Sequence, residues 1–189
     1  MKIVHGDLLS NTDGILVQGC NCHGKMGAGI AGIIRKKYPD VFKRYESRHA
    51  HSGLQLGTVQ FVHNPVEWVE HDSLVLQHLS QQDATPQLPE RLIVANAMTQ
   101  YNYGSDPDTV YVDYDAVFAA FARIRMVARD SARENELTVR FPLIGAGLAN
   151  GEWHIIQDAI AEGLGGDTFD KSELWLLPGT RVPERSFSQ

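Results

Sequence analysis

Features that mark several specialised protein classes are scarce in this sequence of 189 residues. It has only two cysteines, Cys20 and Cys22, and thiols so close in sequence make a poor disulfide framework. We therefore expect a reducing, cytoplasmic location, and the apolar stretch at the N-terminus is too short for a secretion signal. Because no apolar run approaches the about 20 residues of a membrane-spanning helix, we expect no membrane partner.

Positive charge is also in short supply, which bears on the choice of ligand. The 17 basic residues are outnumbered by 23 acidic ones, so the net charge is −6. A large nucleic-acid interface normally requires a basic patch, and we expect no strong nucleic-acid footprint. Repeats and low-complexity segments are missing as well. The length and the hydrophobic content of 43% fit a single domain over residues 1–189, ending in a loose polar tail over 178–189.

The most informative stretch is the segment from Gln18 to Arg35. Apolar residues at 15–17 predict a buried strand, a glycine-dense polar loop follows, and the pattern from Gly29 to Lys37 predicts a helix. This succession directs several backbone N–H groups and the positive end of a helix dipole at one point. Such a nest favours an anion, most commonly a phosphate.

The same stretch invites a second interpretation. Residues 27–32 match the G-x-G-x-x-G pattern of dinucleotide-binding proteins. However, a long polar loop separates these glycines from the strand, and residues 49–56 offer no acidic side chain to hold a ribose. We therefore infer an anion nest rather than a dinucleotide site.

A second unit of strand, glycine loop and helix follows later in the chain. The predicted strand 138–143 leads into Ile144-Gly145-Ala146-Gly147-Leu148, and Trp153, Ile156 and Ile160 mark the inner face of the next helix. Two such loops on one sheet can face each other across the strand ends and hold a pyrophosphate through backbone amides alone. We also predict strands over 2–5, 14–19, 56–63, 91–98 and 173–177, and helices from Pro39 and over 113–134, which together indicate an α/β domain with a mixed sheet between helices.

The polar loop after the strand 91–98 is a further candidate. Loops at the carboxyl ends of strands in open α/β sheets are where ligands bind. Side chains that could line such a site are Asn96, Thr99, Gln100, Tyr101 and Tyr103. A well-packed surface loop remains the alternative.

Several of these motifs, in their order, resemble a known family. Gly6-Asp7-Leu8, Gly19-Cys20-Asn21-Cys22 with Gly27-Ala28-Gly29-Ile30-Ala31, and Ile144-Gly145-Ala146-Gly147-Leu148 with Trp153 are similar to macro domains. The version resembles the ADP-ribose 1''-phosphate processing branch of phages, bacteria and yeast. The resemblance implies a three-layer α/β/α fold and covers most of the chain, with residues 64–88 the poorest match and hence an expected family-variable insertion.

The resemblance also implies a ligand and the residues that bind it. ADP-ribose or ADP-ribose 1''-phosphate would be the small-molecule ligand, with no cofactor, and an ADP-ribosylated macromolecule could be a partner. Asp7 would accept a hydrogen bond from the adenine amine with Leu8 nearby, although from residue type alone Asp7 is a turn carboxylate. Asn21 would contact the distal ribose. The two phosphate loops would comprise Gly27, Ala28, Gly29 and Ile30, and Gly145, Ala146, Gly147 and Leu148.

Three functions remain open at this point. The favoured one is a phosphatase that removes the terminal phosphate of ADP-ribose 1''-phosphate, with His23 and Asn21 as the catalytic candidates, although His23 could be an ordinary loop histidine. Relatives in yeast carry a histidine where this chain has Gln18. The second is a hydrolase that releases ADP-ribose from a macromolecule, yet Ala149 replaces the aspartate of such enzymes and the strand end 95–100 has no lysine. The third is a non-catalytic reader or nucleotide sponge.

The cluster Cys20-Asn21-Cys22-His23 raises the question of a metal. Ligands this close in sequence need partners elsewhere, and no second C-x-x-C or H-x-x-x-H occurs. We predict no metal site, with Cys20 as a small core residue and Cys22 packed within the loop.

Overall fold

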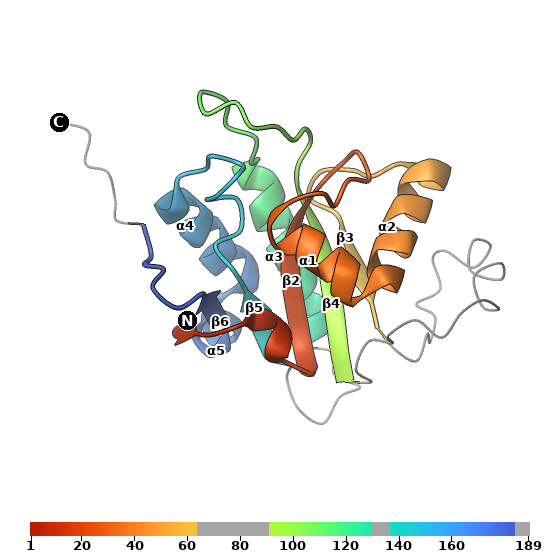
Figure 1. Cartoon of the computed structure of the whole chain (residues 1–189). Coiled ribbons are helices and arrows are strands. Elements are labelled where there is room, and N and C mark those ends of the chain that lie inside the picture. Colours follow the sequence, from red (N-terminus) through yellow and green to blue (C-terminus); the bar gives the residue numbers. More distant parts are fainter. Residues whose placement is uncertain (64–90, 130–136, 184–189) are drawn as a thin grey trace.

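A six-stranded mixed sheet forms the centre of the molecule. The computed structural model describes residues 1–63, 91–129 and 137–183. The strands run in the order β1-β6-β5-β2-β4-β3, and all neighbours are parallel except β3, which is antiparallel to β4 (Figure 1). Their bounds are β1 Lys2–His5, β2 Asp13–Asn21, β3 Val59–Val62, β4 Arg91–Gln100, β5 Val139–Phe141 and β6 Glu173–Leu176.

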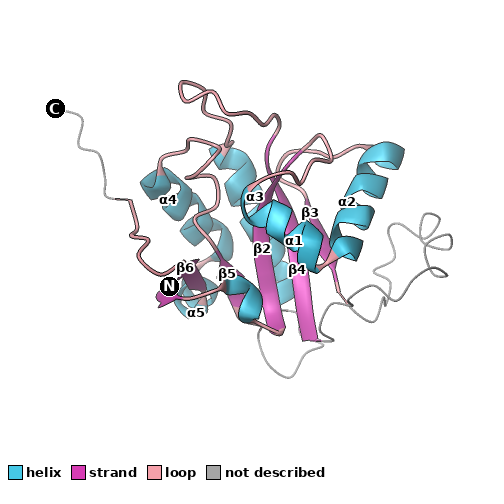
Figure 2. Ribbon diagram, in the orientation of Figure 1, coloured by secondary structure: helices cyan, strands magenta, loops and turns pink. Residues whose placement is uncertain are grey.

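Helices cover both faces of this sheet (Figure 2). On one side lie α1 (Gly29–Lys37) and α2 (Pro39–Ser52), and on the other α3 (Tyr114–Ala128), α4 (Trp153–Leu164) and α5 (Gly166–Lys171). The alternation of β2 explains the two layers, because Ile15 and Val17 pack with α3 and α4 whereas Leu16 packs with α1 and α2. The three-layer α/β/α arrangement expected from the sequence is thereby confirmed.

The element boundaries agree with local sequence signals. Pro39 occupies the first turn of α2, and the Asp113 side chain caps α3 by accepting a hydrogen bond from the Ala116 N–H at 2.8 Å. Two short elements were not expected from the sequence, the 3₁₀ turn η1 (Leu8–Ser10) and α5. The expected insertion at 64–88 lies outside the described residues. The helix predicted over 113–134 ends at Ala128 in the structure, with Arg129 as its C-cap, and residues 130–134 lie outside the described part. In the described part, no helix has the length and apolarity that crossing a membrane requires.

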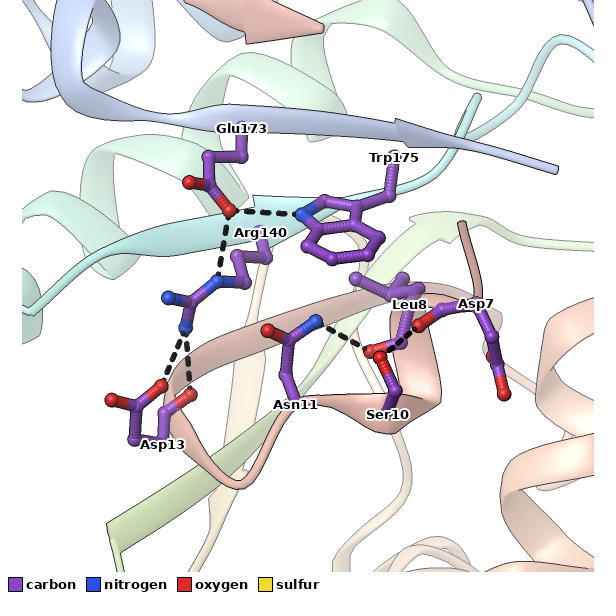
Figure 3. Close-up of polar contacts among 8 residues, drawn as sticks. All are labelled: Asp7, Leu8, Ser10, Asn11, Asp13, Arg140, Glu173 and Trp175. Carbon is purple, nitrogen blue, oxygen red and sulfur yellow. Dashed lines mark hydrogen bonds and ion pairs between the residues drawn. The ribbon is translucent and has the colours of Figure 1, made fainter. Parts of the chain in front are cut away.

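A polar network joins three neighbouring strands at the end opposite their carboxyl termini. Arg140 of β5 donates from Nε to Glu173 of β6 and from Nη1 to Asp13 of β2, both at 3.0 Å (Figure 3). The Arg140 side chain is only 13% exposed and that of Glu173 18%, so this pair is shielded from solvent. The network fixes β5 against both of its neighbours.

The connections of β2 and β5 create an opening between these two strands. They are adjacent and parallel, with Ile15 opposite Val139. The chain leaves β2 toward α1 on one face of the sheet and leaves β5 toward α4 on the other. Such a switch point separates the two following loops and is where open α/β sheets place ligands.

Candidate functional site

A pocket of about 830 Å³ lies at this switch point. Its lining comes from four successive strands of the sheet, beginning at β6 and ending at β4. Since neighbouring strands are about 4.8 Å apart, three steps give the pocket a length of roughly 14 Å. The main contributors are Trp175 on β6, residues 142–145 and 147–149 after β5, residues 19, 21 and 25–31 on and after β2, and Gln100 with residues 103–105 on and after β4.

Asn21 organises the start of the first glycine loop. Its Oδ1 accepts hydrogen bonds from the N–H groups of His23 (3.0 Å) and Lys25 (3.2 Å), and its Nδ2 donates to the Lys25 carbonyl (2.7 Å). The buried Tyr45 hydroxyl of α2 donates to the backbone carbonyl of Asn21. Asn21 lines the pocket, but the residue is only 7% exposed and its side chain is engaged in holding the loop.

The first loop then presents backbone to the pocket. Gly27, Ala28, Gly29 and Ile30 all line it, and no side chain caps the N-terminus of α1. The first N–H groups of this helix therefore face the pocket with the positive end of the helix dipole behind them. A Cβ atom on Gly27 would meet nothing within 4 Å, so the pocket reaches close to the backbone there.

The second glycine loop is tightly closed and faces the first. The N–H of Gly151 donates to the carbonyl of Gly145 at 2.8 Å, and Gly145 has a φ of 75°. Gly147 and the 62% exposed Leu148 line the pocket. Leu148 Cδ1 lies 3.8 Å from the position of a Cβ on Gly29, which shows how closely the two loops approach.

The β6 end of the pocket is aromatic. Trp175 lines it, and the indole Nε1 donates to Glu173 at 2.9 Å, which fixes the ring plane (Figure 3). Leu8 is buried against this region, and Asp7 caps η1 through a 2.9 Å hydrogen bond from the Leu9 N–H. In this structure Asp7 therefore acts as a turn carboxylate.

The β4 end is polar and carries several exposed rings. Tyr103 and Gln100 line the pocket, whereas Asn96 and Thr99 are fully buried in the sheet. His23 lies beside this rim, with its Nε2 2.8 Å from Asn102 Oδ1. Its ring is edge-on to the rings of Tyr101 and Tyr103, with 5.1 and 6.1 Å between the ring centroids. His23 and Tyr101 are not among the lining residues.

Buried thiols and a buried amide pair lie behind the first loop. Cys20 and Cys22 are both free and buried, and burial raises the pKa of each thiol. Gln18 donates to Asn96 Oδ1 at 2.7 Å, with both side chains inaccessible to solvent. In the part of the chain that the structure describes, no three His, Cys, Asp or Glu side chains cluster in a way that could hold a metal ion.

Most of the residues singled out from the sequence surround one pocket. Its lining includes Asn21, Gly27, Ala28, Gly29, Ile30, Gly145, Gly147 and Leu148, while Asp7, Leu8, His23 and Ala146 are outside it. Sequence reasoning did not find Trp175, Lys25 or the contributions of Phe42 and Glu46 from α2. Trp175 was hidden in an ordinary strand pattern, and only its place next to the glycine loops in the sheet reveals it.

Comparison with known proteins finds relatives by sequence and by structure, all at low sequence identity over the full chain. No protein-family model matches the chain. The ADP-ribose 1''-phosphate phosphatase of Debaryomyces hansenii is 25% identical over 180 residues, covering 85% of this chain and 92% of that protein. Among solved structures, the macrodomain of Mycobacterium tuberculosis DarG has a TM-score of 0.64 at 20% identity, covering 94% of this chain and 98% of that one. Thermosipho africanus DarTG in complex with ADP-ribose also has a TM-score of 0.64, at 18% identity, with 96% of this chain and 42% of that chain covered.

Proposed function

We propose that this chain, which has the macrodomain fold, binds ADP-ribose-like nucleotides and hydrolyses the terminal phosphate of ADP-ribose 1''-phosphate. The observation that carries the proposal is the order of chemical environments along the pocket. An indole lies at the β6 end, two amide-rich glycine loops face each other in the middle, and polar side chains follow at the β4 end. A nucleotide with a base, a diphosphate and a distal ribose has the same order.

The dimensions and charge of the pocket support this ligand class. Its volume of about 830 Å³ lies in the ordinary range of small-molecule sites. The amide groups of the two loops supply donors for an anion without basic side chains, which suits a protein of net charge −6. The D. hansenii relative is named for the same substrate, and this chain spans 92% of its length.

The proposed reaction is attack of water on the terminal phosphorus. The bond between phosphorus and the oxygen on the distal ribose breaks, the leaving oxygen gains a proton, and the products are ADP-ribose and orthophosphate. Our candidate for accepting the proton of water is His23, at the rim beside Tyr103, and Asn21 positions the loop that carries it. The glycine loops would hold the diphosphate, so that the terminal phosphate lies toward this rim.

A specific observation also favours a second function, a non-catalytic reader of ADP-ribose. The His23 imidazole is engaged with Asn102 and does not line the pocket, and the Asn21 amide is engaged with its own loop. A binder needs neither group as a catalyst. As a reader, the chain could bind ADP-ribosylated macromolecules, since Tyr103, Gly104 and Ser105 at the β4 end are exposed. The two free thiols agree with the reducing, cytoplasmic location that we expect.

Orthophosphate release and binding distinguish the two functions. The phosphatase proposal expects wild-type protein to release orthophosphate from ADP-ribose 1''-phosphate in many turnovers. His23→Ala should abolish release while calorimetric affinity for ADP-ribose stays within about twofold, and Lys36→Gln, an exposed change outside the pocket, should alter neither. Tight binding of ADP-ribose without any release by the wild type would establish the reader instead. Release that survives in His23→Ala would remove this histidine from the mechanism.

A further inference from the structure

Charged side chains are few around the pocket, and they are unevenly placed. Among its described lining residues, Lys25 and Arg35 are basic and Glu46 is acidic. Arg35 lies six residues beyond the start of α1, roughly 9 Å along its axis, with its guanidinium 4.1 Å from the centroid of the Phe42 ring. Lys25 belongs to the first glycine loop itself, immediately before Met26 and Gly27.

The side-chain amide of Asn21 binds both the N–H and the carbonyl of Lys25. The Lys25 N–H donates to Asn21 Oδ1 and the Lys25 carbonyl accepts from Asn21 Nδ2. Tyr45 in turn fixes Asn21 from α2. The Lys25 side chain is exposed, and within the described residues its ammonium forms no ion pair. The backbone of Lys25 is therefore fixed, whereas its ammonium group can reach a ligand in the pocket.

We propose that Lys25 is a specificity-determining residue that binds the terminal phosphate of ADP-ribose 1''-phosphate. This inference rests on the proposed function. With the diphosphate between the two glycine loops and the base toward Trp175, the distal ribose lies toward Asn21 and Gln100. A phosphate on that ribose adds about −1.5 to −2 charges at the end of the pocket where Lys25 lies.

The terminal phosphate needs a donor that the glycine loops do not supply. In this placement the loop amides bind the diphosphate, and the protein as a whole is negatively charged, so the Lys25 ammonium is an available cation. A hydrogen bond between an ammonium and a phosphate oxygen is roughly twice as strong as a neutral one, although an exposed lysine is partly screened. We expect Lys25 to favour ADP-ribose 1''-phosphate over ADP-ribose by about five- to tenfold in apparent affinity.

The test compares selectivity in matched variants. Wild type, Lys25→Gln, the charge-retaining Lys25→Arg and the control Lys36→Gln are each measured for the Kd of ADP-ribose by calorimetry. The KM for ADP-ribose 1''-phosphate follows from orthophosphate release, or its Kd from calorimetry if no release occurs. Lys25→Gln should lower the preference for the phosphorylated ligand about five- to tenfold and leave ADP-ribose affinity within about twofold. Lys25→Arg and Lys36→Gln should keep the wild-type preference.

The outcomes separate this inference from the function on which it rests. An unchanged preference in Lys25→Gln, or an equal loss in Lys36→Gln, would overturn the role of Lys25 and leave the proposed function intact. A wild type that binds neither nucleotide would overturn the proposed function itself. In wild type, raising the salt concentration from 0.1 to about 0.5 M should reduce the preference, because screening weakens an exposed ammonium. In Lys25→Gln the preference should respond less to salt.

Discussion

Gly145 offers a sharp test of how the second glycine loop is built. Its φ of 75° places it in the left-handed region, which disfavours residues with a Cβ. A Cβ there would lie 2.7 Å from Val112 Cγ2 and 3.1 Å from Ile156 Cδ1, and both side chains are buried. Gly145→Ala must therefore strain the backbone and displace packed core side chains.

The size of the effect follows from three contributions. Left-handed backbone costs a residue with a Cβ about 1–2 kcal/mol. Inserting a methyl group into a well-packed core costs about 1–3 kcal/mol. Alanine recovers about 0.4–1 kcal/mol by restricting the unfolded chain. We expect Gly145→Ala to lower the free energy of unfolding by about 1–4.5 kcal/mol.

Gly147→Ala is the matched control, because a Cβ there meets nothing within 4 Å and Gly147 also lines the pocket. Its free energy of unfolding in urea should lie within about 0.5 kcal/mol of the wild-type value. Its affinity for ADP-ribose should nevertheless fall about tenfold or more, since the methyl group occupies ligand space. Equal stabilities of Gly145→Ala and wild type would refute the packing argument, and undiminished affinity of Gly147→Ala would refute the placement of the ligand.

Three further predictions concern the surroundings of the pocket. Tyr45→Phe removes the hydroxyl that donates to the Asn21 carbonyl and should cost about 1–2 kcal/mol in urea unfolding while weakening ADP-ribose binding; a neutral effect on both would contradict the anchoring role. Glu173→Gln should cost about 1–2 kcal/mol, because the shielded Arg140 guanidinium loses its charged acceptor, and a thermal melt unchanged from wild type would speak against this network. Burial raises the pKa of the Cys20 thiol above its usual 9.0, so the unfolded chain releases this proton at a lower pH than the folded protein does. The stabilisation by the neutral thiol is thus fully present below pH 9 and is lost as the pH rises above it. In Cys20→Ala the free energy of unfolding should fall less steeply, by about 1.4 kcal/mol per pH unit between pH 9.5 and 11. An unchanged slope would refute the raised pKa of Cys20.

The central strands and the two glycine loops were predictable from local patterns. The apolar runs at 15–17 and 92–95 are typical of buried strands in a covered sheet, and α1 has the predicted bounds Gly29–Lys37. The glycine loops were recognisable because each stands between a strand and a helix. In the structure these two loops follow the carboxyl ends of β2 and β5.

What escaped prediction depends on strand order, which no local pattern encodes. Trp175 borders the pocket only because β6 pairs with β5, and Phe42 does so only because α2 returns beside the first loop. The hydrogen bonds that hold Asn21 were equally invisible, since they join residues through a loop shape and a helix 24 positions away. The short helix α5 was missed because its six residues include two acidic side chains and offer little apolar periodicity.

Phosphorus NMR of ADP-ribose 1''-phosphate with the wild-type protein tests the central claim most directly. With stoichiometric protein, binding between the glycine loops should shift or broaden the two diphosphate resonances. With catalytic amounts, the terminal monophosphate signal should decay into orthophosphate while the diphosphate stays intact. Diphosphate resonances that remain unchanged at protein concentrations equal to the ligand would contradict the claim that these two loops form the nucleotide site.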